Sequence, residues 1–134
     1  MIGLDTNVLL RYLLQDDPNQ SAIATSTLEQ AIAVGETFFV SDIVLCEFVR
    51  VLESALRMPK ADIVLLLDQV LRLSHISFQD SETIWRAFDA YQTSKGDFSD
   101  YLIGEIARRM DCDHTLTFDR ALQGSPVFHL IANR

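Results

Sequence analysis

The chain has 134 residues, 49% of them hydrophobic, and a formal net charge of −8. This length predicts a single domain over residues 1–134 with a substantial core. The acidic balance argues against a nucleic-acid partner, because phosphate-binding surfaces are usually basic, unless some of the acids are metal ligands. The most apolar run, Ile63–Leu73, is too short to cross a membrane. No basic leader precedes an apolar segment, so no signal peptide is expected.

The chain contains two cysteines, Cys46 and Cys112. Both lie in apolar sequence contexts, and they do not have CxxC spacing. They are therefore predicted to be buried free thiols, which is typical of a cytoplasmic protein.

Strand-like and helical segments alternate along the chain. In chain order they are a strand at Ile2–Leu4, helices at Thr6–Leu14 and Gln20–Val34, a strand at Thr37–Val40, helices at Asp42–Arg57 and Lys60–Leu73, a strand at His75–Phe78, helices at Ser81–Thr93 and Phe98–Met110, and strands at His114–Phe118 and Val127–Ile131. This order predicts an α/β domain with a mostly parallel sheet. Ligands of such sheets bind beyond the carboxyl ends of the strands. Residues that directly follow a strand are therefore candidates for a site.

Two acids follow predicted strands. Asp5 comes after the first strand, and Asp119 comes after the strand at 114–118. The alternative at each position is a cap or turn residue, because aspartate readily accepts hydrogen bonds from the first N–H groups of a helix. Thr117 would point to the same side as Asp119 if the strand geometry persists to that residue.

Glu47 lies within a predicted apolar helix. Its neighbours three and four residues away are Ile43, Val44, Arg50 and Val51, and only Arg50 is polar. A carboxylate on such a face must be solvated, paired or bound to a cation, because burying it alone is too costly. The alternative to a ligand role is an ion pair with Arg50.

Asp97 and Asp100 are three residues apart at the start of another apolar helix. The alternative to a ligand role here is a capping arrangement, with Asp97 as the N-cap and Asp100 as a favourable acid in the first turn. Asp100 is the stronger ligand candidate, since it leads directly into a run of apolar residues that faces the core.

An α/β sheet would gather these acids at one edge, where several carboxylates cannot all ionise comfortably without a cation. Mg²⁺ and Mn²⁺ suit ligands that are all oxygen. Two bound divalent ions would also halve the formal charge of −8. The histidines, His75, His114 and His129, show no HxxxH or HxH pattern, so a zinc site is not expected.

The order LDTNVLL, VLCEFVRVL, DFSDYLIGEIA and TLTFD resembles the PIN-domain ribonucleases over essentially the whole chain, and more narrowly the VapC toxins. The resemblance implies a three-layer α/β/α domain with a mostly parallel central sheet flanked by helices. It places the catalytic and metal-binding acids of the family on Asp5, Glu47, Asp100 and Asp119, with a further metal-binding acid at Asp97 and orienting polar residues at Thr6, Asn7 and Thr117. The departure is Gly104-Glu105, where many relatives carry two alanines.

The resemblance also implies a function. The protein would be a Mg²⁺-dependent endoribonuclease, with Mn²⁺ as a substitute, that cuts structured RNA such as tRNA or rRNA and leaves a 5′-phosphate and a 3′-hydroxyl. It would be the toxin of a toxin–antitoxin pair in the cytoplasm, held inactive by a VapB-like antitoxin in the active-site groove. Helices around Phe48–Leu56 and Ile63–Leu71 are candidates for that groove or for a homodimer face, and ordinary core is equally compatible with them.

Three other functions stay open. One is a PIN-domain nuclease that processes RNA outside a toxin–antitoxin pair, and another is a degenerate domain that binds without catalysis. The third is a phosphoacceptor receiver, which needs paired acids near the end of the first strand and a lysine after a late strand. Only Asp5 lies at that first strand end, and neither Lys60 nor Lys95 follows a late strand.

Overall fold

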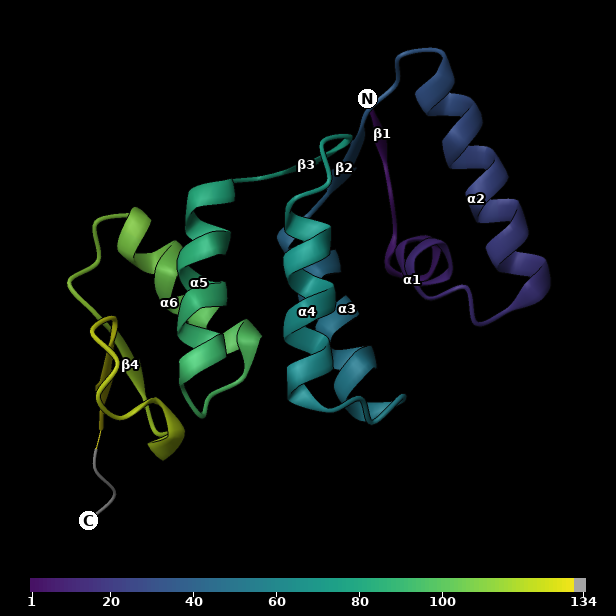
Figure 1. Cartoon of the computed structure of the whole chain (residues 1–134). Coiled ribbons are helices and arrows are strands. Elements are labelled where there is room, and N and C mark those ends of the chain that lie inside the picture. Colours follow the sequence, from purple (N-terminus) through teal and green to yellow (C-terminus); the bar gives the residue numbers. More distant parts are fainter. Residues whose placement is uncertain (132–134) are drawn as a thin grey trace. The chain divides into compact units, whose positions relative to one another are not determined.

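The computed structural model describes residues 1–131. The chain divides into two compact units, Met1–Gln79 and Asp80–Arg134 (Figure 1). The single domain expected from the length stays a prediction. Across the described residues, every helix is too short or too polar to cross a membrane.

The first unit is built on a parallel three-stranded sheet. Its strands are β1 (Ile2–Gly3), β2 (Phe38–Val40) and β3 (Ile76–Phe78), in the order β1-β2-β3. Phe38 of β2 lies opposite Ile2 on one side and Ile76 on the other. Four helices belong to this unit: α1 (Thr6–Leu14), α2 (Pro18–Ala33), α3 (Asp42–Ser54) and α4 (Lys60–Leu71).

Apolar spacing explains the core of this unit. Helix α1 contacts both α2 and α3, and α3 contacts α4. Each helix turns apolar residues recurring at three and four positions inward, as a partly buried helix must. The side chains of Leu9, Phe38, Leu45, Leu52 and Leu67 are almost fully buried as a result.

The second unit pairs two helices with a small parallel sheet. It contains α5 (Ser81–Thr93), α6 (Phe98–Arg109), β4 (Thr115–Thr117), a 3₁₀ turn η1 (Arg120–Leu122) and β5 (Phe128–Leu130). Helices α5 and α6 lie side by side (Figure 1). They bury Ile84, Phe88 and Tyr101 between them and their neighbours. The parallel pairing of β4 with β5 completes the predicted α/β class, which is confirmed: parallel strands accompanied, within the described residues, by six α-helices.

Most predicted elements occur near their expected bounds. Helix α2 begins earlier than predicted, at Pro18, because the Asp17 side chain accepts from the N–H groups of Asn19 and Gln20 and proline suits the first helical position. Helix α3 ends at Ser54, earlier than the expected Arg57.

The prediction of two buried thiols is wrong for Cys112. Both cysteines are free, but Cys46 is half-buried and Cys112 is exposed. Cys112 follows Asp111, whose positive φ of 65° turns the chain away from the end of α6. On α3, burial and then the charge of Asp42 raise the pKa of the Cys46 thiol to about 11, so this thiol is a poor nucleophile at neutral pH.

Gly104, part of the departure from the usual alanine pair, is required by packing. A Cβ atom at this position would lie 2.7 Å from Phe128 Cε2 and 2.8 Å from Val127 Cγ2. Both distances are shorter than real contacts allow, so α6 can approach β5 this closely only with glycine. The glycine therefore fixes the distance between α6 and the small sheet.

We expect Gly104→Ala to destabilise the protein by about 1 kcal/mol. Overpacking costs about 1–3 kcal/mol, and the better helix propensity of alanine offsets up to about 1 kcal/mol of it. Urea unfolding of the two proteins measures the difference. Gly3→Ala is the matched control, because a Cβ at Gly3 meets nothing within 4 Å. Equal midpoints for Gly104→Ala and Gly3→Ala would contradict this account of the packing.

Candidate active site

In the first unit, the start of α1 lies against α3. Asp5 follows β1 and caps α1, where its Oδ1 accepts from the N–H of Val8 at 3.0 Å. The next residue, Thr6, donates from Oγ1 to Glu47 Oε2 at 2.8 Å. This hydrogen bond joins residues 41 positions apart in the sequence, and it brings the first two predicted acids to one region of the unit. Asn7 is exposed beside them.

Glu47 is solvated and does not form the alternative ion pair. The side chain is exposed, as is Ile43 one turn earlier, so the expected cost of burial does not arise. Its partner is the Thr6 hydroxyl, and no ion pair between Glu47 and Arg50 occurs among residues 1–131. The pairing alternative is therefore wrong. Glu47 keeps one oxygen, Oε1, for a further partner.

In the second unit, Asp97 and Asp119 lie close enough to Asp100 to affect its ionisation. Asp97 takes the N-cap position of α6, but its side chain makes no capping hydrogen bond, and Asp100 lies in the first turn. The pKa of the Asp100 carboxyl is raised, first by burial and then by the charges of Asp97 and Asp119. A hydrogen bond that this carboxyl group makes with the backbone of Asp97 lowers the pKa, but by less. Burial and the two neighbouring charges thus both disfavour the ionised form of Asp100.

Asp119 is held by the turn that follows β4. Its N–H donates to Thr117 Oγ1 at 3.0 Å, and its Oδ1 accepts from the N–H of Ala121 at 2.9 Å. Thr117, expected to help orient the acids, therefore acts on the backbone of Asp119. As with Asp5, the cap uses one carboxylate oxygen and leaves the other available.

A buried phenol positions the loop before Asp97. The N–H of Gly96 donates to the Tyr101 hydroxyl at 2.9 Å, and both residues are buried. A Cβ at Gly96 would lie 2.5 Å from Leu122 Cδ2 and 2.8 Å from this hydroxyl. Neither residue is among those predicted from the sequence. The signal available was the glycine directly before an acid-rich helix start.

Asp42 is a further acid at a strand end, predicted from the sequence only as the start of a helix. It follows β2 and opens α3, and its N–H donates to Gln79 Oε1 at 2.8 Å. Burial raises the pKa of its carboxyl, and its buried Oδ1 has no hydrogen-bond partner among the described residues. Its position just after a strand, like that of Asp5, was the signal that could have found it.

The available donors suit a hard divalent cation. They are carboxylate oxygens, which Mg²⁺ and Mn²⁺ prefer, and the mutual repulsion at Asp100 is what a bound cation would relieve. Neither unit, within residues 1–131, contains a group of three His, Cys, Asp or Glu side chains that could hold a metal ion by itself. A single site formed by all the predicted acids stays a prediction.

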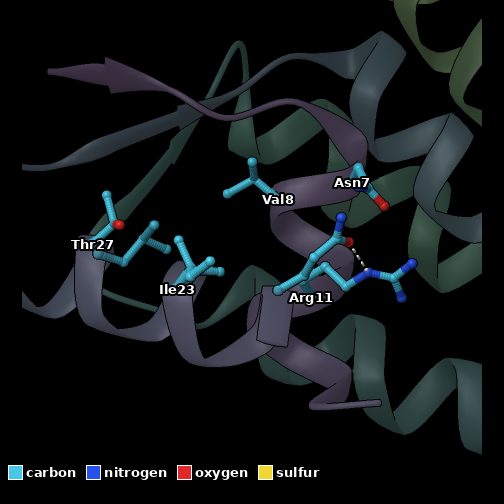
Figure 2. A pocket seen from close by; sticks show the side chains of 8 residues that line it. Asn7, Val8, Arg11, Ile23 and Thr27 are labelled. Atoms are coloured by element: carbon cyan, nitrogen blue, oxygen red, sulfur yellow. Dashed lines mark hydrogen bonds between the residues drawn. The ribbon is translucent and has the colours of Figure 1, made fainter. Parts of the chain in front are cut away.

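A hollow of about 350 Å³ lies between α1 and α2 in the first unit. Figure 2 shows side chains of both helices facing it, including Val8 from α1 and Ile23 from α2. Arg11 Nε donates to Gln20 Oε1 at 2.8 Å beside it. Asn7 also lines the hollow, so this largely apolar surface adjoins the Thr6–Glu47 contact. Its volume is that of a small binding pocket.

The helices expected to form a groove contribute mainly to the core. Val49 and Leu52 of α3, and Leu67 and Val70 of α4, are buried. Leu65 is exposed. A groove or a homodimer face on these helices stays a prediction.

Parallel strands with helices between them define an α/β protein, and Asp5 and Asp119 follow the first and fourth of these strands. The sequence matches the PIN domain family over residues 2–124, and the chain belongs to that family. PIN domains are typically metal-dependent nucleases. None of the curated proteins compared with the chain matches it.

We expect Asp100→Asn to raise the melting temperature of the metal-free protein at pH 7. A raised pKa in the folded state means that the ionised carboxylate is less favourable there than in the unfolded chain. Removing that charge therefore stabilises the fold. The gain should fade as the pH falls and Asp100 of the parent takes up a proton.

Differential scanning calorimetry with EDTA present measures this change. Asp89→Asn is the control, because it removes the same charge from an exposed position on α5. A melting temperature of Asp100→Asn no higher than that of Asp89→Asn would contradict the account of Asp100 as a carboxylate that burial and neighbouring charges disfavour.

Proposed function

We propose that this PIN domain is a divalent-metal-dependent endoribonuclease and the toxin of a toxin–antitoxin pair, similar to VapC. The supporting observation is that each unit gathers its own predicted acids. Thr6 links the start of α1 to Glu47, and burial together with the charges of Asp97 and Asp119 raises the pKa of Asp100. These residues stand in the sequence motifs that resemble those of the family.

The proposed roles follow from the contacts. Asp5, Glu47, Asp100 and Asp119 would hold Mg²⁺ or Mn²⁺, with Asp97 as a further ligand. Thr6 holds the Glu47 carboxylate in place, and Thr117 fixes the backbone of Asp119. Asn7 would hold a water molecule or orient a carboxylate from its exposed position. When bound, such ions supply charge neutralisation and activate water for attack on a phosphodiester.

The substrate proposed here is structured RNA, such as tRNA or rRNA. Specific cleavage of RNA depends on unstacked bases and local shape more than on duplex sequence. An acidic protein can still bind phosphates where cations offset its carboxylates. The cytoplasm is the expected location, in keeping with two free cysteines.

Asp5→Asn tests the catalytic proposal with little risk to the fold. Asparagine caps helices about as well as aspartate, so the hydrogen bond from the Val8 N–H to position 5 should survive while the ligand charge is lost. We expect cleavage of labelled tRNA in Mg²⁺ to fall by at least about 10–100-fold, the loss seen even when only a residue that orients a metal ligand is removed. The melting temperature should stay close to that of the parent.

Asp17→Asn is the matched control, because Asp17 caps α2 in the same way. It should cleave as fast as the parent, and EDTA should abolish both activities. Equal rates for Asp5→Asn and Asp17→Asn would refute the role of Asp5. RNA binding without EDTA-sensitive cleavage would favour the non-catalytic domain, and phosphate transfer to Asp5 would favour a receiver.

The toxin half of the proposal requires a partner. We propose that a VapB-like antitoxin places an apolar segment in the hollow between α1 and α2, with a cationic side chain reaching the nearby carboxylates. The support is the apolar lining by Val8, Ile23 and Leu28 and the adjoining Thr6–Glu47 contact. An arginine would be attracted by these carboxylates through charge-assisted hydrogen bonds. A nuclease that processes RNA alone would have no such partner.

Ile23→Asp tests this interaction. Ile23 is 67% exposed, so the change should not unfold the protein. It should weaken capture of the small protein encoded beside its gene by at least about tenfold, because a desolvated charge in an apolar pocket costs more than 1.4 kcal/mol. RNA cleavage by the free protein should stay unchanged.

Leu65→Asp tests the alternative groove on α4 in the same way, since Leu65 is 66% exposed there. It should bind as the parent does. Equal loss of binding by both variants would reject the α1–α2 hollow, and a parent that captures no such protein would reject the toxin role while leaving the nuclease role standing.

A further inference from the structure

The pairing of β4 with β5 brings two histidines together that lie far apart in the sequence. His129 is in register with Leu116, and His114 precedes β4 by one residue. Side chains two residues apart along a strand share a face. His114, Leu116 and His129 therefore belong to the same face of this small sheet, and all three are exposed.

The two imidazoles are direct neighbours. Their ring centroids are 5.0 Å apart, and their planes are inclined by 42°. Neither ring has a hydrogen bond or ion pair to another side chain within residues 1–131. The ring nitrogens are thus available to a ligand from solvent.

This separation suits two histidines on one metal ion. A metal–nitrogen bond of about 2.0–2.1 Å and tetrahedral bond angles place the centroids of two ligating imidazoles about 5 Å apart. The observed 5.0 Å meets this condition. Hard ions such as Mg²⁺ prefer oxygen, whereas imidazole suits zinc, copper and nickel.

We propose that His114 and His129 form a binding site for Zn²⁺. No third His, Cys, Asp or Glu joins them within the described part of the chain, so water would fill the other positions and the ion would exchange with solvent. The bound ion would link β4 to β5 and stabilise the second unit by binding only its folded state.

This site is separate from the candidate active site. His114 precedes the amino end of β4, whereas Asp119 follows its carboxyl end. Five residues of extended chain span about 16 Å. The inference is independent of the proposed nuclease function, because it rests on nitrogen ligands and a different ion.

Zinc titration of the untagged full chain tests the proposal. Isothermal titration calorimetry in excess Mg²⁺, which occupies carboxylate sites, should detect one zinc ion per chain. His114→Ala and His129→Ala should each lower zinc affinity by at least about tenfold, and the double variant should be little weaker than either. Zinc should raise the melting temperature of the parent and of neither single variant.

Two controls keep the outcome decisive. His75→Gln removes the third histidine, which contacts Tyr12 and Phe38 in the other unit, and Cys112→Ser removes the nearby exposed thiol. Both should bind zinc as the parent does. Because His114 and His129 are exposed, circular dichroism should show all variants folded. No zinc binding by the parent, equal affinity in the His114 and His129 variants, or loss of binding with Cys112→Ser would overturn the proposal.

Discussion

Parallel pairing makes neighbouring strands release the chain at the same edge of a sheet. In the first unit, β1 ends at Gly3, two residues before Asp5, and β2 ends at Val40, just before Ser41 and Asp42. The helices that follow both strands therefore start side by side, and α1 and α3 pack against each other. The Thr6–Glu47 hydrogen bond depends on this packing. Without the parallel pairing, α1 and α3 would not start at the same edge of the sheet, and Asp5 and Glu47 would not be brought near each other.

Local signals in the sequence predicted much of the fold and only part of the site. The bounds of α1 were predicted correctly because a cap at Asp5 and apolar spacing both act within a few residues. The Thr6–Glu47 contact spans 41 positions and depends on how helices pack, which spacing alone does not encode. The His114–His129 pair likewise depends on strand register, so a search for HxH or HxxxH patterns could not find it.

Capping and metal binding, treated as alternatives from the sequence, are compatible in the structure. Asp5 and Asp119 each use one oxygen to accept a backbone N–H, which leaves the second oxygen of each carboxylate for another partner. The hydrogen bond fixes the side chain in one orientation before any ligand arrives. A carboxylate held in this way loses less conformational entropy on binding than a mobile one. An aspartate that caps a helix is therefore well suited to act as a metal ligand.

The hydrogen bond from the Gly96 N–H to the Tyr101 hydroxyl has an implication for comparing relatives. It ties the loop entering α6 to a residue inside that helix, so Asp97 and Asp100 depend for their placement on a buried phenol and a buried glycine. A family member could retain every acid and still lose activity through a substitution at the position of this glycine or this tyrosine. Inventories of acidic residues would then overstate how many members are active.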